Sequence, residues 1–290
     1  MKIGSTDIDK LYIGSTEADK AYLGSTEVYA ASGGGVTTIQ SIVASACGDL
    51  DATIASSYGG TGTNWANLIS SPADSTSQST NDATISGSGT MTFSGSAGDS
   101  GAYFESDGNA YFLASTNDTF LNEIHKTNNK WWFAMACRRT FNGRFGIAGT
   151  SFSGGNPGFY ALSGNGGTNN SQYYQVDDSE SFNGSSNMGS WTTGQDTLVI
   201  VTGDNEATID SLKFYTNSDT AIEKNVTYGA STTDLAYPAG IGCINNNGSI
   251  TQDLGNTYRV YSFAWGNSFL TDTEAADIRD FYEARHSRTY

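Results

Sequence analysis

The chain has 290 residues, enough for one large domain or two small ones, and its 35 glycines, three prolines and 37% hydrophobic content are typical of a loop-rich β protein. Its 14 basic and 30 acidic residues give a formal net charge of −16. This charge argues against nucleic-acid binding, because no basic cluster is available to neutralise phosphates. No segment approaches the roughly 18 apolar residues that a membrane span requires, so we expect no membrane insertion.

Residues 2 to 29 repeat one ten-residue phrase three times. Glycine occupies positions 4, 14 and 24, and each glycine is followed by Ser-Thr and then a carboxylate. The segments between these clusters, residues 8–13 and 18–23, alternate two sets of side chains. Period-two segments bounded by Gly-Ser-Thr clusters predict short strands joined by tight turns. We therefore expect a small antiparallel β meander over residues 1–29.

This meander has too few apolar residues to close a core of its own. Isolated sheets of two or three strands are marginal in water, and their free edges invite pairing with other chains. We therefore expect residues 1–29 to be an anchor that assembles with copies of itself, as a homotrimer or a repeated array, or with another protein. The residues expected to form this assembly surface are Ile3, Ile8, Leu11, Tyr12, Ile13, Tyr22, Leu23, Val28 and Tyr29.

A Gly/Ser-rich run over residues 30–36 is typical of a flexible linker. Residues 37–290 are expected to form one domain, in which apolar segments are separated by Gly, Ser, Asn and Asp. The predicted strands are Thr37–Ala44, Thr90–Phe93, Ala102–Glu105, Ala110–Ala114, Lys130–Arg139, Arg144–Ala148, Phe159–Leu162, Tyr173–Val176, Thr197–Thr202, Asp210–Tyr215, Ala239–Cys243 and Thr257–Trp265. Strands at this spacing without helices between them predict a two-sheet antiparallel sandwich.

One helix is predicted, at the C-terminal end of the chain. Thr271 and Glu274 form a capping-box pattern, and an apolar stripe at three- and four-residue spacing follows. The stripe consists of Ala275, Ile278, Phe281 and Tyr282. His286 is expected at the frayed end of this helix, where a positive charge suits the helix dipole.

The three cysteines, Cys47, Cys137 and Cys243, are odd in number and widely spaced, so we expect buried free thiols. The first residues are polar and contain no apolar signal region. Synthesis in a reducing compartment without export is therefore expected.

Several segments resemble known families. The segment 258–265, followed by Leu-Thr-Asp-Thr-Glu at 270–274, resembles the tail of concanavalin A-like jelly rolls of the laminin-G and pentraxin kind. In those folds a last strand is followed by L-[ST]-D-x-E and a closing helix. The front-half segments 51–58, 65–69 and 120–126 resemble the version found in virion proteins of tailed bacteriophages, and the Gly-Ser-Thr decamers resemble N-terminal segments of phage tail and head appendages.

The resemblance implies either a glycan-binding display module or a glycanase. Retaining glucanases of the jelly-roll class place three acids on one strand as Glu-x-Asp-x-(x)-Glu, which brings two carboxylates into one cleft. The segment 105–107 begins this pattern but lacks the second Glu, and the acids at 177–180 lie in a loop-like context. His125 is expected to be structural, and no Gly-x-Ser-x-Gly elbow is present. We therefore predict no catalytic residues and no enzyme activity.

The predicted glycan-binding surface is the Gly/Asn-rich segment from Gly154 to Tyr174. Aromatic rings stack on sugar faces, and amides bond sugar hydroxyls. The candidate residues are Tyr160, Tyr173, Tyr174, Asn165, Asn169 and Asn170. Alternation places Tyr173 and Tyr174 on opposite faces of a strand; core packing is the alternative for each tyrosine.

Calcium is the one ion that suits loops of this kind, near Asp107 and Asn109, although the same residues also suit an ordinary β-turn. Two histidines and scattered cysteines argue against zinc, and no metal site or other cofactor is assigned.

The resemblance implies a non-enzymatic structural protein of a bacteriophage virion, assembled in the host cytoplasm. Its N-terminal β repeats would attach it to other virion proteins, and its lectin-like domain would contact host-surface glycans. A tail fibre or baseplate appendage is the first interpretation, and a capsid decoration or head-fibre protein is the alternative. A glycan hydrolase of the jelly-roll glucanase type is the alternative from another class.

Overall fold

A computed structural model of the 290-residue chain divides into two units, Met1–Thr38 and Ile39–Tyr290. The structure describes residues 2–3, 6–7, 12–13, 16–17, 20–23, 26–30, 37–141, 143–151, 157–163, 171–176, 182–185, 191–206, 212–224, 231–251 and 257–290. The two units are described separately below. The predicted linker at 30–36 lies outside these residues, except for Ala30 at the end of a strand.

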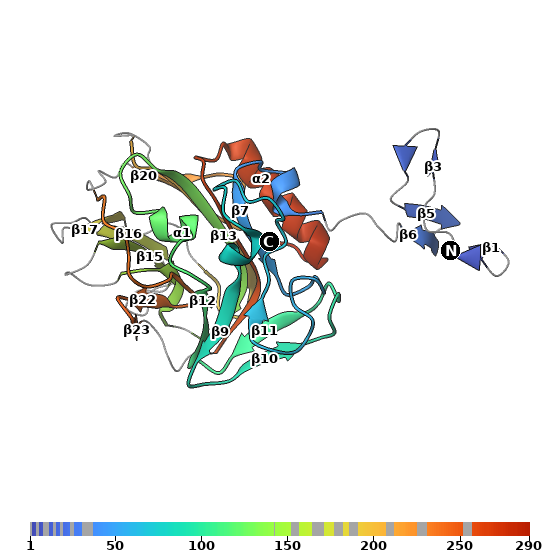
Figure 1. Cartoon of the computed structure of the whole chain (residues 1–290), viewed down its shortest axis with the longest axis horizontal. Coiled ribbons are helices and arrows are strands. Elements are labelled where there is room, and N and C mark those ends of the chain that lie inside the picture. The colour runs from blue at the N-terminus through green and yellow to red at the C-terminus, as the bar shows by residue number, and fades with distance from the viewer. Residues whose placement is uncertain are drawn as a thin grey trace. The chain divides into compact units, whose positions relative to one another are not determined.

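The first unit contains three β-hairpins, one for each sequence repeat (Figure 1). The paired strands are β1 (Lys2–Ile3) with β2 (Thr6–Asp7), β3 (Tyr12–Ile13) with β4 (Thr16–Glu17), and β5 (Lys20–Leu23) with β6 (Thr26–Ala30). The expected single meander is corrected: each pair is a two-stranded sheet of its own among the described residues.

The predicted assembly residues are distributed over these hairpins. Seven of them lie on strands: Ile3, Tyr12, Ile13, Tyr22, Leu23, Val28 and Tyr29. Ile8 and Leu11 lie outside the described residues. The assembly role of all nine stays a prediction.

The second unit is built from two antiparallel eight-stranded sheets. The first sheet has the order β10-β11-β24-β13-β18-β19-β20, with β7 also paired to β24. Its strands are β7 (Ala46–Asp51), β10 (Met91–Ser94), β11 (Tyr103–Ser106), β13 (Lys130–Arg139), β18 (Asp196–Asp204), β19 (Leu212–Thr216), β20 (Ile222–Lys224) and β24 (Tyr258–Gly266). The apolar run at 198–201 lies on β18, inside the sheet, as predicted.

The second sheet has the order β17-β16-β15-β14-β21-β12-β9-β8. Its strands are β8 (Asn64–Trp65), β9 (Ala83–Gly87), β12 (Ala110–Ala114), β14 (Phe145–Gly149), β15 (Gly158–Ser163), β16 (Ser171–Val176), β17 (Phe182–Ser185) and β21 (Gly240–Ile241). A separate hairpin joins β22 (Ile244–Asn246) to β23 (Ser249–Thr251). The predicted all-β two-sheet sandwich is confirmed.

The main core lies between the two sheets and is rich in aromatic rings. Trp131 of the first sheet contacts Tyr173 of the second, with ring centroids 4.8 Å apart, and Phe104 contacts Phe112 across the same interface at 5.0 Å. All four side chains are fully or almost fully buried. Because each large buried side chain contributes roughly 1.5–3 kcal/mol, this aromatic layer is a main source of stability.

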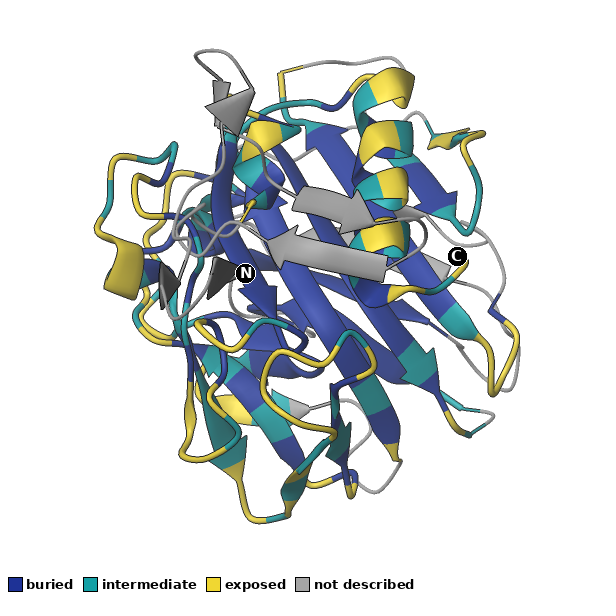
Figure 2. Ribbon diagram, turned by 90° about the vertical axis from the view of Figure 1, so that its right-hand side faces the viewer, coloured by how far each residue is buried: buried dark blue, intermediate teal, exposed yellow. Residues whose placement is uncertain are grey.

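The other face of the first sheet is covered by the C-terminal helix α2 (Asp272–His286) and by the η1 segment (Ile39–Ser41) (Figure 1). The predicted capping box is present: the Thr271 hydroxyl accepts from the backbone N–H of Glu274, and the Glu274 carboxylate accepts from that of Thr271. Ala275, Ile278 and Tyr282 are buried against the sheet, as predicted, while Phe281 is half-buried. Figure 2 shows the opposite side of the helix exposed.

One predicted strand is wrong. Residues 37–44 form a loop with the 3₁₀ turn η1, and the strand β7 begins only at Ala46. The backbone N–H of Ile39 donates to the buried carboxylate of Asp49 at 2.9 Å, so this segment is bonded to a side chain instead of a neighbouring strand.

Two further findings concern the cysteines and the helices. The three cysteines are buried and free, as predicted. The helices in the described part of the chain are α1 (Phe120–Glu123), α2, η1 and η2 (Gln78–Asn81), and none of them combines the length and the apolar character that crossing a membrane requires.

Candidate functional site

Tyr237 is the most exposed large apolar side chain that the structure describes. Its side chain is 44% exposed, and Ile222, at 37%, is the other exposed member of this class among the described residues. Tyr237 lies in the irregular segment 231–239, which leads into β21. The Tyr237 ring is therefore accessible to a ligand, whereas most of the aromatic side chains described in this domain are buried.

Side chains from the region around α1 hold this segment in place. Asn122 donates from Nδ2 to the carbonyl of Tyr237 at 2.9 Å, and its Oδ1 accepts from the backbone N–H of Ala239 at 2.8 Å. Asn117 donates to the carbonyl of Leu235 at 2.9 Å. These amides satisfy backbone groups that have no strand partner, so an irregular segment keeps a defined course.

The β22–β23 hairpin supports the Tyr237 ring from one side. Gly248 has a φ of +85°, and a Cβ built at this position would lie 2.7 Å from Cε1 of Tyr237. The ring therefore lies against the bare backbone of the hairpin turn, an approach that only glycine allows. Asn245 connects the same hairpin to the segment by donating to the carbonyl of Pro238 at 2.8 Å.

A pocket of about 180 Å³ opens beside this ring. Its lining combines the aromatic ring with hydroxyl, amide and carboxylate groups. The lining residues are Thr150, Pro157, Thr233, Asp234, Leu235, Ala236, Tyr237 and Asn247. A flat ring beside convergent hydrogen-bonding groups is the arrangement that binds a sugar, because the ring covers the apolar face while the polar groups bond the hydroxyls.

Asp234 gives the pocket its charge. Its side chain is 88% exposed and pairs with the ammonium of Lys126, which also pairs with Glu123. The hydrogen bond and the positive charge of Lys126 hold the pKa of Asp234 below its usual value, so the carboxylate is ionised at neutral pH. His125, one residue before Lys126, places Nε2 3.1 Å from the carbonyl of Thr233, which is a structural contact as expected.

The structure places the predicted tyrosines away from this pocket. Tyr173 is fully buried against Trp131 and Phe159, so its ring is not available to a sugar. Tyr160 is only 7% exposed and packs with Leu162. For these two residues the core alternative holds, and their predicted ligand role is corrected.

The remaining predicted ligand residues are not tested. Tyr174 lies on β16, but its side chain is outside the described residues, as are Asn165, Asn169 and Asn170 entirely. The predicted surface and the observed pocket are formed by different residues. The described pocket lining includes Pro157 from the segment 154–174 but none of the predicted glycan-binding residues.

The predicted calcium residues form a turn between β11 and β12. The Asp107 carboxylate accepts from the backbone N–H groups of Thr90 at 2.7 Å and Asn109 at 2.9 Å, and these bonds lower its pKa. Gly108 has a φ of +94°, which fits a tight turn. The described residues contain no group of three or more His, Cys, Asp or Glu side chains that could hold a metal ion. Calcium binding here stays a prediction.

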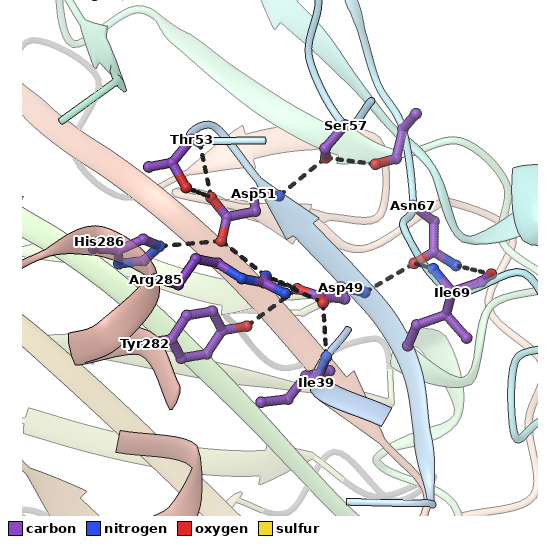
Figure 3. Close-up of polar contacts among 11 residues, drawn as sticks. Ile39, Asp49, Asp51, Thr53, Ser57, Asn67, Ile69, Tyr282, Arg285 and His286 are labelled. Carbon is purple, nitrogen blue, oxygen red and sulfur yellow. Dashed lines mark hydrogen bonds and ion pairs between the residues drawn. The ribbon is translucent and has the colours of Figure 1, made fainter. Parts of the chain in front are cut away.

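A second polar cluster joins β7 to α2 (Figure 3). Arg285 lies between two fully buried carboxylates, with Nη1 3.1 Å from Asp49 Oδ1 and 3.0 Å from Asp51 Oδ2. His286 places Nε2 3.1 Å from Asp51 Oδ2 and Nδ1 2.7 Å from the hydroxyl of Tyr290. The predicted position of His286 at the end of the helix is confirmed, but this end is not frayed, because the ring is buried and bonded to Asp51 and Tyr290.

The electrostatics of this cluster follow from its burial. Burial raises the pKa of Asp51, but His286, Arg285 and a hydrogen bond from Thr53 outweigh burial and lower the pKa to about 2. Burial also raises the pKa of Asp49, and Arg285 offsets only part of that rise. The two acids are paired and enclosed, so they stabilise the fold and cannot reach a substrate.

Glu105, the first acid of the incomplete glucanase pattern, forms an ion pair within the sheet. Glu105 on β11 accepts from Arg259 on β24 at 2.6 Å. The acids at 177–180 lie outside the described residues.

No protein-family model and no curated protein matches the sequence. Among solved structures, the receptor-binding domain of botulinum neurotoxin C/D mosaic serotype is similar, with 12% identity and a TM-score of 0.52 over 83% of this chain and 51% of that chain. The binding domain of botulinum neurotoxin DC in complex with SialylT matches at 10% identity and a TM-score of 0.52, covering 84% of this chain and 52% of that one.

An enzyme is also among the similar structures. A mutant of Trypanosoma rangeli sialidase displaying trans-sialidase activity has 13% identity and a TM-score of 0.51, over 85% of this chain and 34% of that chain. This chain thus spans about half the length of the toxin binding domains and about a third of the sialidase. At such low identity the likeness shows the fold: this protein is a β-sandwich of the kind found in those binding domains.

Proposed function

We propose that this chain is a non-enzymatic, lectin-like virion protein whose sandwich domain binds a host-surface glycan through the Tyr237 pocket. The observation that carries this proposal is the Tyr237 ring, which is 44% exposed and backed by the turn at Gly248. A ring fixed in this way needs no further ordering before a sugar stacks on it, which favours binding. Asp234 and Asn247 offer an acceptor and an amide for the sugar hydroxyls.

The acid chemistry of the pocket supports binding over hydrolysis. Glycosidases commonly need two carboxyl groups on either side of the scissile bond, roughly 5 to 9.5 Å apart. The described residues that line the pocket include one acid, Asp234. The paired acids Asp49 and Asp51 are enclosed beneath α2. A glycan hydrolase therefore remains the alternative with less support.

Binding to a glycan array, followed by affinity measurement on the strongest hit, tests the proposal. Tyr237→Ala should weaken binding about fivefold or more, since the stacking of a sugar on an aromatic ring contributes about 1 kcal/mol or more. Ile222→Ala removes the other exposed apolar side chain, lies outside the pocket lining and should leave the affinity unchanged. Equal affinity of Tyr237→Ala and the unmodified protein, or steady release of reducing sugar from the bound glycan, would contradict the proposal.

The proposed attachment to a virion rests on the N-terminal hairpins. Three separate two-stranded sheets are marginal structures that gain stability when their edges pair with other strands. We assign them the partners expected from the sequence, namely copies of this chain and other virion proteins. A tail fibre or baseplate appendage is the first placement, and a capsid decoration or head fibre is the second.

Deletion of residues 1–29 tests this attachment. The second unit has its own core, so the truncated protein should stay folded and keep its glycan affinity while its incorporation into purified virions, measured by mass spectrometry, falls to background. Incorporation at the level of the full chain would show that another part of the protein makes the attachment.

A further inference from the structure

The described lining of the Tyr237 pocket contains one acid and no cation. Among the described residues that line it, Asp234 is the one ionised group, and neither lysine nor arginine is present. The Asp234 side chain is 88% exposed, so its charge faces solvent and an approaching ligand. The whole chain adds a net charge of −16 to this local field.

The nearest cation is already paired twice. The ammonium of Lys126 pairs with Glu123 and with Asp234, which leaves one positive charge among two negative ones. A ligand carboxylate would be the third anion around this one ammonium. The three groups together carry one net negative charge, and of the three Asp234 lines the pocket.

The size and the polar lining of the pocket indicate one sugar ring. Its volume of about 180 Å³ is below the roughly 300–1,000 Å³ typical of sites for drug-sized ligands. Asn247 is exposed at the hairpin turn, and Thr150 directly follows β14, where its largely buried hydroxyl accepts from the backbone N–H of Phe159 at 3.1 Å. These groups are neutral hydrogen-bonding partners suited to hydroxyl groups.

We propose that the Tyr237 pocket selects a neutral terminal sugar and rejects acidic sugars such as sialic acid. This inference rests on the proposed glycan-binding function and adds the class of sugar. A ligand carboxylate a few ångströms from Asp234 would meet the two acids Asp234 and Glu123 against the single cation Lys126 and would be repelled, whereas a neutral ring loses nothing by approaching them. Two of the similar structures have names that refer to a sialidase or to SialylT, but this chain shares only their fold. A preference for neutral sugars would therefore be a property of this chain's own pocket.

Matched glycan pairs provide the test. The full-length chain is titrated with lactose and 3′-sialyllactose, and an array presents further pairs that differ only by a terminal sialic acid, together with terminal glucose, mannose and N-acetylglucosamine. Neutral glycans should bind, and each sialylated partner should bind at least about tenfold more weakly than its neutral form. Equal or tighter binding of the sialylated forms, weakened by Tyr237→Ala, would overturn the inference and leave the proposed function intact.

A charge variant completes the test. Asp234→Asn should narrow the difference in affinity between neutral and sialylated glycans. The affinity for the sialylated glycans should rise about threefold or more, because the substitution removes the repelling charge and releases Lys126 from one acid. Asp277→Asn removes an exposed acid from α2, outside the described pocket lining, and should leave the affinity difference unchanged. An unchanged difference in Asp234→Asn would overturn the inference, and no binding to any glycan would overturn the proposed function with it.

Discussion

Two polar clusters of this protein contain the same kinds of side chain, yet they differ in burial and in partners. In the cluster between β7 and α2, Asp49 and Asp51 are fully buried and share Arg285. In the pocket cluster, Asp234 and Tyr237 are exposed to solvent. The first cluster directs its polar atoms at one another, whereas the second leaves an aromatic face and a carboxylate directed at solvent.

The comparison shows which cluster is suited to each role. A buried ion pair costs desolvation, and removal of one partner leaves a charge without compensation, so such clusters are sensitive points of stability. An exposed acid and an exposed ring contribute little to folding. Under the proposed function, the exposed ring beside Gly248, on a segment bonded by Asn122, serves ligand binding.

The largest expected effect comes from breaking the buried cluster. Asp51→Asn should lower the free energy of unfolding by roughly 3 kcal/mol at pH 7, because Arg285 and His286 lose a buried anionic partner. The folded pKa of Asp51 is about 2, below its ordinary value of 3.8, so its stabilisation is complete above about pH 4 and is lost as the pH falls toward 2. The difference in free energy of unfolding between the unmodified protein and Asp51→Asn should therefore shrink by about 2 kcal/mol across that pH range.

Urea unfolding between pH 7 and pH 2, followed by tryptophan fluorescence, measures this difference. Asp107→Asn is the matched control, since Asp107 is an exposed aspartate whose pKa is lowered by backbone hydrogen bonds from Asn109 and Thr90 and not by a charged partner. It should change stability far less than Asp51→Asn. A stability loss in Asp51→Asn that does not depend on pH would show that the charge of Asp51 is not what joins the strand to the helix.

The parts of the fold that sequence predicts well are those with strong local signals. The strands Lys130–Arg139 and Ala110–Ala114 are predicted with their exact bounds, because their apolar runs end sharply at polar residues. The C-terminal helix begins where its capping box places it. By contrast, β8, β22 and β23 have two or three residues each, too few to show any period.

Both polar clusters escape sequence prediction because their contacts are distant along the chain. Asn122 bonds the Tyr237 carbonyl across 115 residues, and Arg285 reaches Asp49 across 236. No periodic pattern surrounds Tyr237, whereas Tyr173 sits in a clear tyrosine-rich segment that turned out to be core. The available signal for the buried cluster was a strand with two acids between apolar residues at 46–51, together with Arg-His near the C-terminal end.

The smallest expected effect on stability, with a specific effect on binding, comes from Gly248→Ala. The φ of +85° makes alanine unfavourable by about 1 kcal/mol, and its Cβ would displace the Tyr237 ring. Gly194→Ala is the matched control, because Gly194 has a φ of +82° and nothing within 4 Å of a Cβ. Both variants should lose a similar amount of stability, but only Gly248→Ala should weaken glycan binding severalfold. If both variants bind glycan as tightly as the unmodified chain, the hairpin turn does not position the Tyr237 ring. The exposed cluster would then lack the fixed geometry that the buried cluster between β7 and α2 has.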